Sequence, residues 1–209
     1  MIYLLNNQKF DGVINLPAIK IKFLETDIDF NGVKYLLFTS KNGVLATNNI
    51  TDKWKNIPAI CIGEPTANMV KRLGGSVVYV AKQSYGDELA KEIIQNFKPT
   101  KILFLRAKKV LSNITQILKE HSFDVIEKIV YQTECEKITN IPDKGIFIFT
   151  SPSTIECFLS QVPWKKTYKA IAIGHKTAKV FPYDIITSPI QTISHCIQLA
   201  KDLYEKSDD

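Results

Sequence analysis

The chain has 209 residues, of which 45% are hydrophobic, with a formal net charge of +6 and a pI of about 9.0. This content suffices for one large domain or two of roughly 100 residues each, and no apolar run approaches the ~18 residues that a transmembrane helix needs. The lysines are spread along the chain in short pairs such as Lys108–Lys109, which suits a small polyanionic ligand and does not indicate DNA or RNA.

The segment MIYLLNNQKF at the start has no basic region and no small-residue cleavage site, so it predicts a first β-strand and not a signal peptide. Further strands are predicted at LLFT, PAICIG, SVVYV and KILFL. The segments that follow them predict helices: SKNGVLAT, PTANMVKRL, GDELAKEIIQNF and VLSNITQILKEH. This alternation predicts parallel sheets with helices on both faces.

The second half of the chain repeats the first. LLFTSKNGV at 36–44 matches FIFTSPSTI at 147–155, and AICIGEPTA at 59–67 matches AIAIGHKTA at 170–178, both at an offset of 111 residues. A further match, of LAKE with LAKD, has an offset of 110. Three matches with nearly one offset indicate a tandem duplication.

The second repeat lacks the strand that closes the first, and the start of the chain offers a substitute, because IYLLN resembles ILFLR. We therefore expect one α/β domain at about residues 25–128, and a second, discontinuous one at residues 1–15 plus 138–209. The chain would cross between them twice, at 16–24 and 129–137. Both crossings alternate apolar and polar residues, which predicts two extended strands side by side.

The four cysteines are scattered, without a CxxC motif or a histidine at ligand spacing: Cys61, Cys135, Cys157 and Cys196. This spacing predicts neither a structural zinc site nor a disulfide framework. Reduced cysteines and a cytoplasmic location are the resulting expectation.

Ligands of open parallel sheets bind beyond the carboxyl ends of the strands, where both FTS turns and both IGxxT turns fall. Ser151 before Pro152 predicts a helix N-cap with proline in the first turn. A helix start offers free N–H groups and the positive end of the helix dipole, and a hydroxyl completes an anion site. Four such turns suit a ligand with many carboxylates or phosphates, unless the serines and threonines are only caps.

Motifs for covalent catalysis are missing from the sequence, which has no GxSxG, GxxxxGKS or GxGxxG. His175 has Glu64 as its counterpart in the first repeat and no triad partner, and Ser40 and Ser151 lack a nearby base. Tyr131, in VYQT on a predicted crossing strand, is a neutral hydrogen-bond donor at pH 7, because a free tyrosine has a pKa near ~10. It is either a catalytic donor or a packed aromatic.

In their order and spacing, the motifs FTSKNGV, IGEPTA, VYQT, FTSPS and IGHKTA resemble the uroporphyrinogen-III synthase family over essentially the whole chain. The resemblance implies two flavodoxin-like α/β domains joined by a two-stranded β-ladder. It also implies a lyase of heme biosynthesis that acts as a monomer. The substrate is hydroxymethylbilane, a linear tetrapyrrole with many carboxylates, which the enzyme closes to uroporphyrinogen III. Water is lost, ring D is inverted, and no cofactor, metal, nucleic acid or membrane takes part.

Tyr131 matches the tyrosine of the family's VYQT motif, the implied proton donor to the leaving hydroxide. The implied carboxylate-binding residues are Ser40, Asn42, Thr66, Ser151, Ser153, Lys169 and Thr177. Asn42 stands where some relatives carry arginine, and the helix that usually follows the first strand has no room here. Two alternatives stay open: a binding or sensor protein that holds a small polyanion without turnover, and, on charge alone, a nucleic-acid-binding module.

Overall fold

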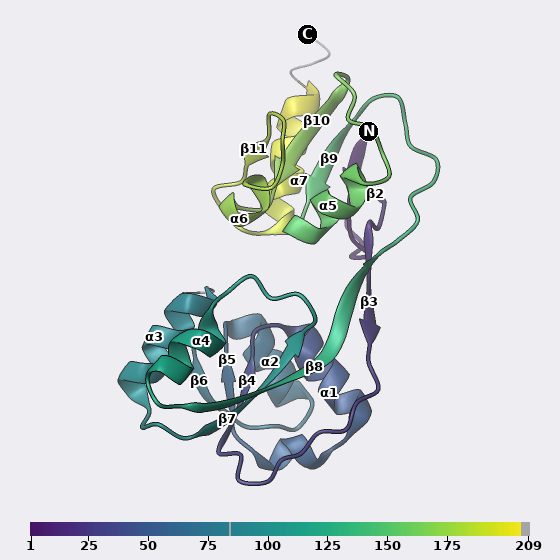
Figure 1. The fold of residues 1–209 in the computed structure, drawn as a ribbon. Coiled ribbons are helices and arrows are strands. Elements are labelled where there is room, and N and C mark those ends of the chain that lie inside the picture. The colour runs from purple at the N-terminus through teal and green to yellow at the C-terminus, as the bar shows by residue number, and fades with distance from the viewer. Residues whose placement is uncertain (84, 206–209) are drawn as a thin grey trace. The chain divides into compact units, whose positions relative to one another are not determined.

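The computed structural model describes residues 1–83 and 85–205, and the chain divides into two compact units (Figure 1). Unit 1 consists of Met1–Lys20 and the chain from Glu134 on, and unit 2 of Ile21–Thr133. Each unit is an α/β structure whose strands form a sheet of its own. No described helix is both long and apolar enough to cross a membrane.

Unit 2 contains a six-stranded sheet in the order β3-β8-β7-β4-β5-β6. The strands are β3 (Ile19–Phe23), β4 (Tyr35–Phe38), β5 (Ala59–Cys61), β6 (Val77–Val80), β7 (Lys101–Ala107) and β8 (Asp124–Cys135). The helices are α1 (Lys41–Ile50), the 3-10 helix η1 (Lys53–Asn56), α2 (Glu64–Arg72), α3 (Gly86–Asn96) and α4 (Ile114–Glu120). The pairs β8–β7, β7–β4, β4–β5 and β5–β6 are parallel, as the sequence predicts.

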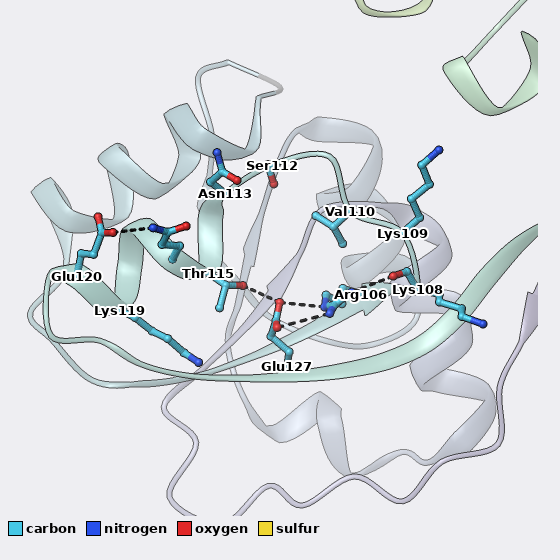
Figure 2. A pocket seen from close by; sticks show the side chains of 11 residues that line it. Arg106, Lys108, Lys109, Val110, Ser112, Asn113, Thr115, Lys119, Glu120 and Glu127 are labelled. Atoms are coloured by element: carbon cyan, nitrogen blue, oxygen red, sulfur yellow. Dashed lines mark hydrogen bonds and ion pairs between the residues drawn. The ribbon is translucent and has the colours of Figure 1, made fainter. Parts of the chain in front are cut away.

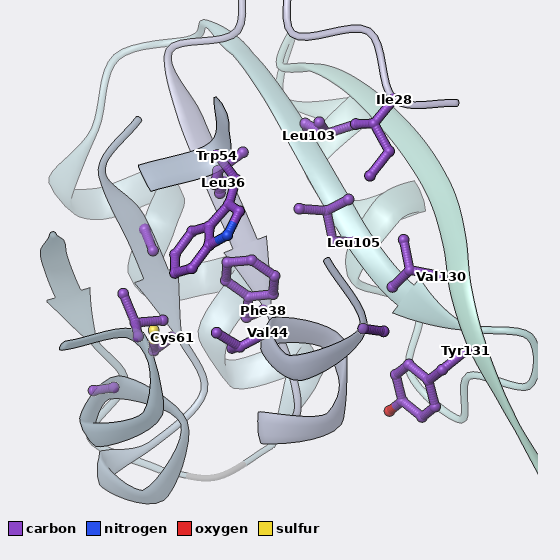
Figure 3. Close-up of a cluster of buried hydrophobic side chains, with 14 residues drawn as sticks. Ile28, Leu36, Phe38, Val44, Trp54, Cys61, Leu103, Leu105, Val130 and Tyr131 are labelled. Carbon is purple, nitrogen blue, oxygen red and sulfur yellow. The ribbon is translucent and has the colours of Figure 1, made fainter. Parts of the chain in front are cut away.

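Side-chain alternation on the strands gives unit 2 two apolar cores, because successive residues of a strand face opposite sides of the sheet. On β4, Phe38 packs with Val44 of α1 and with Trp54, in the cluster of Figure 3. Leu37 faces the other way and belongs to a cluster with Leu89 of α3 and Leu118 of α4. Unit 2 is therefore a three-layer structure, with α1 and α2 on one face of the sheet and α3 and α4 on the other.

Unit 1 contains a five-stranded parallel sheet in the order β11-β10-β9-β1-β2. The strands are β1 (Ile2–Leu4), β2 (Ile14–Asn15), β9 (Gly145–Phe149), β10 (Tyr168–Ala172) and β11 (Ile186–Thr187), and the helices are α5 (Pro152–Leu159), α6 (His175–Ala178) and α7 (Ile193–Glu205). Tyr3 of β1 pairs with Phe147 of β9, so the expectation that the start of the chain completes the second sheet is confirmed. Residues 5–13, between β1 and β2, form no helix.

The two sheets share one strand order. When the strands of unit 2 are numbered along the chain from β4, and β3 is left out, their order in the sheet is 3-2-1-4-5. Unit 1 gives the same order when its numbering starts at β9 and β1 and β2 are counted as strands 4 and 5. This common order agrees with a duplication. Numbered in plain chain order, with β1 as the first strand, unit 1 runs 2-1-3-4-5, which is the strand order of flavodoxin.

A disulfide joins Cys135, the last residue of β8, to Cys157 of α5, whereas Cys61 and Cys196 are free and buried. The prediction that all four cysteines are reduced is therefore wrong for this pair. The two cysteines are 22 residues apart in the sequence and belong to no cysteine motif, so their spacing did not predict the bond. They meet only through the packing of the end of β8 against α5.

Candidate functional site

The start of α1 lies against the end of β7 in unit 2. Ser40 is the N-cap of α1, and its Oγ accepts a hydrogen bond of 3.1 Å from the backbone N–H of Asn42. A Cβ added at Gly43 would lie 2.8 Å from the carbonyl oxygen of Leu105. Only glycine therefore lets α1 approach β7 so closely. This contact holds Ser40 and Asn42 beside β7, whose neighbour β8 carries Tyr131.

Tyr131 of β8 is 7% exposed and lies at the margin of the apolar cluster shown in Figure 3. The nearby side chain of Ser40 affects the pKa of its phenol. Burial raises the pKa of Tyr131 above the ordinary value of 10.0, and the side chain of Ser40 offsets part of this rise. The phenol is therefore protonated at neutral pH, and the structure brings together two of the predicted site residues, the donor candidate and an FTS serine.

Thr66 lies in the first turn of α2, and its side chain is buried at 4% exposure. Gly63 is the N-cap residue and has no side-chain oxygen, and its carbonyl accepts a hydrogen bond of 3.1 Å from the Thr66 N–H. Thr66 is thus not the cap of its helix. For this residue the explanation that the hydroxyl only caps a helix does not hold.

A pocket of about 810 Å³ borders the loop between β7 and α4 and was not predicted from the sequence (Figure 2). Its lining includes four cations: Arg106, Lys108, Lys109 and Lys119. Arg106 is paired with Glu127, with Nε 2.9 Å from Oε1, so much of its charge is compensated. The backbone N–H of Lys108 donates a 2.9 Å hydrogen bond to the carbonyl of Tyr131, which attaches this basic loop to the strand of the candidate donor.

The sequence did contain a signal for this loop. The Lys108–Lys109 pair directly follows β7, of sequence KILFLRA, and therefore occupies a carboxyl-end turn, as the FTS and IGxxT motifs do. Because this turn has no repeated counterpart, the comparison of the two repeats could not find it.

In unit 1, Ser151 and Thr154 form a capping box at the start of α5. The Thr154 N–H donates to Ser151 Oγ, and the Ser151 N–H donates to Thr154 Oγ1, both at 3.3 Å. Proline follows the cap, as predicted, and Ser153 lies half-buried in the same turn. This turn is therefore a stable helix start with its serine cap in place.

Thr177 is buried at 3% exposure in α6, and its N–H donates to the carbonyl of Gly174 at 3.0 Å. This repeats the geometry of Thr66 and Gly63 in unit 2. Helix α6 has only four residues, so its dipole is smaller than that of α2. The side chain of Gln191 lies 3.1 Å from the point where a Cβ on Gly174 would be, and no sequence signal connected these two residues.

Lys169 does not join the other candidates of unit 1. It is the second residue of β10 and pairs with Ile146, at the amino ends of the strands, whereas Ser151 and Thr177 follow the carboxyl ends. Exposed there, it lines a separate pocket of about 260 Å³ with Met1 and Lys144.

The sequence model of the uroporphyrinogen-III synthase HemD family matches residues 8–198 of this chain. The chain belongs to the uroporphyrinogen-III synthase family. The crystal structure of uroporphyrinogen-III synthetase from Helicobacter pylori is similar over 97% of this chain and 98% of that one, with 25% identity and a TM-score of 0.84. A mutant uroporphyrinogen III synthase from Thermus thermophilus, 14% identical, has the same fold over 93% of this chain and 90% of that one, with a TM-score of 0.57.

A curated protein of Methanocaldococcus jannaschii, provisionally named a uroporphyrinogen-III synthase, is 25% identical over 224 residues, covering 97% of this chain and 93% of that protein. Membership in this family makes the protein an enzyme of tetrapyrrole biosynthesis. The non-catalytic alternative is not favoured by these comparisons.

No activated nucleophile was expected of a uroporphyrinogen-III synthase, and the hydrogen-bonded pair of Ser188 and His195 does not supply one. Ser188 Oγ donates to the carbonyl of Ile190 at 2.6 Å, so His195 Nδ1, 2.8 Å away, is the donor to Ser188 and not its base. His175 is exposed at the start of α6. Among the described residues, no group of three His, Cys, Asp or Glu side chains could hold a metal ion.

Proposed function

We propose that this protein cyclises hydroxymethylbilane to uroporphyrinogen III, with loss of water and inversion of ring D. The observation that carries the proposal is Tyr131, a buried, protonated phenol near Ser40 at the carboxyl ends of the strands, in a chain of the uroporphyrinogen-III synthase family. A protein that only bound the tetrapyrrole would not need such a donor.

Tyr131 is proposed to donate its proton to the hydroxyl that leaves the end of the bilane. Water departs and a pyrrole-stabilised cation remains, which a substituted carbon of ring D attacks first, through a spiro intermediate. The proton that the last ring releases on rearomatising restores the phenol. The enzyme then contributes a general acid and the folding of the bilane, two effects that each lower the barrier without a covalent nucleophile.

The carboxylates of the substrate are proposed to bind at the helix starts, through backbone N–H groups and the side chains of Ser40, Asn42, Thr66, Ser151, Ser153 and Thr177. To these we add Lys108 and Lys109 of the basic loop, because this loop is hydrogen-bonded to Tyr131. Lys169 is left out of the proposed site, since it lies at the amino end of β10.

The two units are proposed to be the two domains, with the crossing segments 16–24 and 129–137 as the two-stranded connection. Two observations support this: β3 neighbours β8 in the sheet, and the N–H of Glu136 donates to the carbonyl of Ala18 at 2.9 Å. The proposal includes a monomeric enzyme of the cytoplasm that acts on a small molecule and requires neither nucleic acid nor a membrane.

The isomer formed tests the proposed reaction. The purified protein is given freshly generated hydroxymethylbilane, the products are oxidised, and type I and type III porphyrins are separated by chromatography. Predominant type III is expected. Type I alone, formed at the rate without enzyme, would overturn the proposal and favour the binding protein.

Replacing either buried threonine by alanine should weaken substrate binding and leave kcat nearly unchanged. We expect the KM of Thr66→Ala or Thr177→Ala to rise roughly fivefold, because one hydrogen bond contributes about 1 kcal/mol. Steady-state kinetics with hydroxymethylbilane measure this effect. Thr66→Ser and Thr177→Ser keep the hydroxyl and serve as controls, and an alanine variant with the KM of its serine control would contradict the assigned role.

Neutralising the basic loop should also weaken binding. For Lys108→Gln/Lys109→Gln we expect a KM roughly fivefold higher at low salt, because each exposed ion pair contributes up to about 1 kcal/mol, and a smaller dependence of KM on salt. Lys165→Gln/Lys166→Gln removes the same charge from unit 1 and is the matched control. Equal KM values in the two double variants would remove the loop from the site.

A further inference from the structure

The disulfide of unit 1 lies where β8 ends and fixes that end of the strand to α5. Strand β8 carries Tyr131 and passes from unit 2 into unit 1 between Thr133 and Glu134. Its last residue, Cys135, is bonded to Cys157 of α5, with the two Cα atoms 5.2 Å apart. The bond therefore joins the strand of the candidate acid to the helix whose N-cap is Ser151.

We propose that Cys135 and Cys157 form a thiol–disulfide site that reacts with low-molecular-weight disulfides and controls how firmly the end of β8 is attached to unit 1. This property goes beyond the proposed reaction and does not depend on it.

Without the disulfide, weaker contacts hold this segment. The Glu136 N–H donates to the carbonyl of Ala18 at 2.9 Å, and the Glu136 carbonyl accepts from Gln161 Nε2 at 2.9 Å. Gln161 Oε1 accepts from the N–H of Ile138 at 3.1 Å. Gln161 is itself exposed, so these hydrogen bonds compete with water. Reduction should therefore leave unit 1 folded but let the segment after Cys135 open more often.

The burial of the four cysteines separates this pair from the other two. Cys135 is exposed and Cys157 is 6% exposed, so an external reagent reaches the pair at Cys135. Cys61 and Cys196 are both fully buried. Burial raises the pKa of Cys61 to about 12, which keeps it as an unreactive thiol.

The exchange reaction balances with oxidised glutathione as the partner. The Cys135 thiolate attacks one glutathione sulfur, forming a mixed disulfide and releasing one glutathione. The Cys157 thiolate then attacks Cys135 Sγ and releases the second. The two cysteine protons leave with the two glutathiones, so the protein loses two electrons and oxidised glutathione gains them.

Counting thiols tests the site. The full-length protein is incubated with oxidised or reduced glutathione, unfolded in iodoacetamide and analysed by mass spectrometry. We expect two of the four cysteines to be alkylated after oxidation and all four after reduction, with peptide mapping placing the bond at Cys135 and Cys157. Four alkylated cysteines under both conditions, or a bond to Cys61 or Cys196, would overturn the proposal.

Hydrogen exchange tests the effect on attachment. The amides of Glu136 and Ile138 should exchange several-fold faster in the reduced protein and in Cys135→Ser than in the oxidised protein, and Cys61→Ser should match the unchanged protein. Equal exchange in the oxidised and reduced forms would show that the bond does not control attachment. Neither measurement uses turnover, so failure here is separate from failure of the synthase reaction.

Discussion

Tyr131→Phe should lower the rate of uroporphyrinogen III formation by about 10²–10⁴-fold, the usual contribution of a general acid, and leave the fold intact. The change removes one oxygen and keeps the ring in its apolar cluster. The interaction of the phenol with Ser40 is lost, but both side chains lie at the margin of the core, so the loss of stability should be small beside the loss of rate.

The control for this variant is a second buried tyrosine. Tyr168 is 5% exposed, and its hydroxyl donates to the carbonyl of Pro142 at 2.7 Å, within unit 1. Tyr168→Phe removes an oxygen and its hydrogen bond without touching the proposed acid. The control should keep the wild-type rate, and initial rates of type III formation compare the two variants. A wild-type rate in Tyr131→Phe would exclude Tyr131 as the acid.

The pH dependence of the reaction follows from the pKa of Tyr131, which burial raises above 10.0. The phenol can donate only while it is protonated, that is, below its pKa. Activity that depends on it should therefore be level through neutral pH and fall only as the pH rises above about 10. A fall due to this group near pH 8 would require a lowered pKa, opposite to the effect of burial.

The sequence predicted the main features of the fold through its repeat. The matched motifs implied two similar parallel sheets, and the likeness of IYLLN to ILFLR placed the start of the chain beside β9. The order of the strands did not follow from the repeat, because hydrophobic alternation shows which face of a strand is buried and not which strand lies next to it.

The same reasoning explains the outcome at the site. Ser40 and Thr66 could be placed because their motifs follow strand ends, and Tyr131 because VYQT lies on a predicted crossing strand. Lys169 became a candidate through the family resemblance, as a basic residue just before the second IG motif, but it is the second residue of β10, and the rest of that strand, at about 3.3 Å per residue, separates it from the turn that contains Thr177. A strand separates its two ends in space, so closeness in sequence across it does not bring side chains to one site.

Phe147→Ala should be among the most destabilising substitutions in unit 1. Phe147 is fully buried in the middle of the sheet, and its ring lies 4.7 Å from that of Tyr168, 5.1 Å from Phe158 and 5.2 Å from Tyr3, between ring centroids. Removing a buried phenylalanine lowers the free energy of unfolding by about 3–5 kcal/mol. Since Tyr3 lies on β1, the pairing of the start of the chain with β9 should weaken as well.

Hydrogen exchange at increasing denaturant can locate this loss, because peptides from each unit are followed separately. In Phe147→Ala, the amides of β1 and β9 should lose protection at lower denaturant than in the unchanged protein, and those of β4 and β7 should not. Phe38→Ala, which removes a buried phenylalanine from unit 2, should give the reverse result. Loss of protection in both sheets together, in either variant, would mean that the two units unfold as one. Separate transitions would instead show that the start of the chain belongs energetically to the unit that its residues complete.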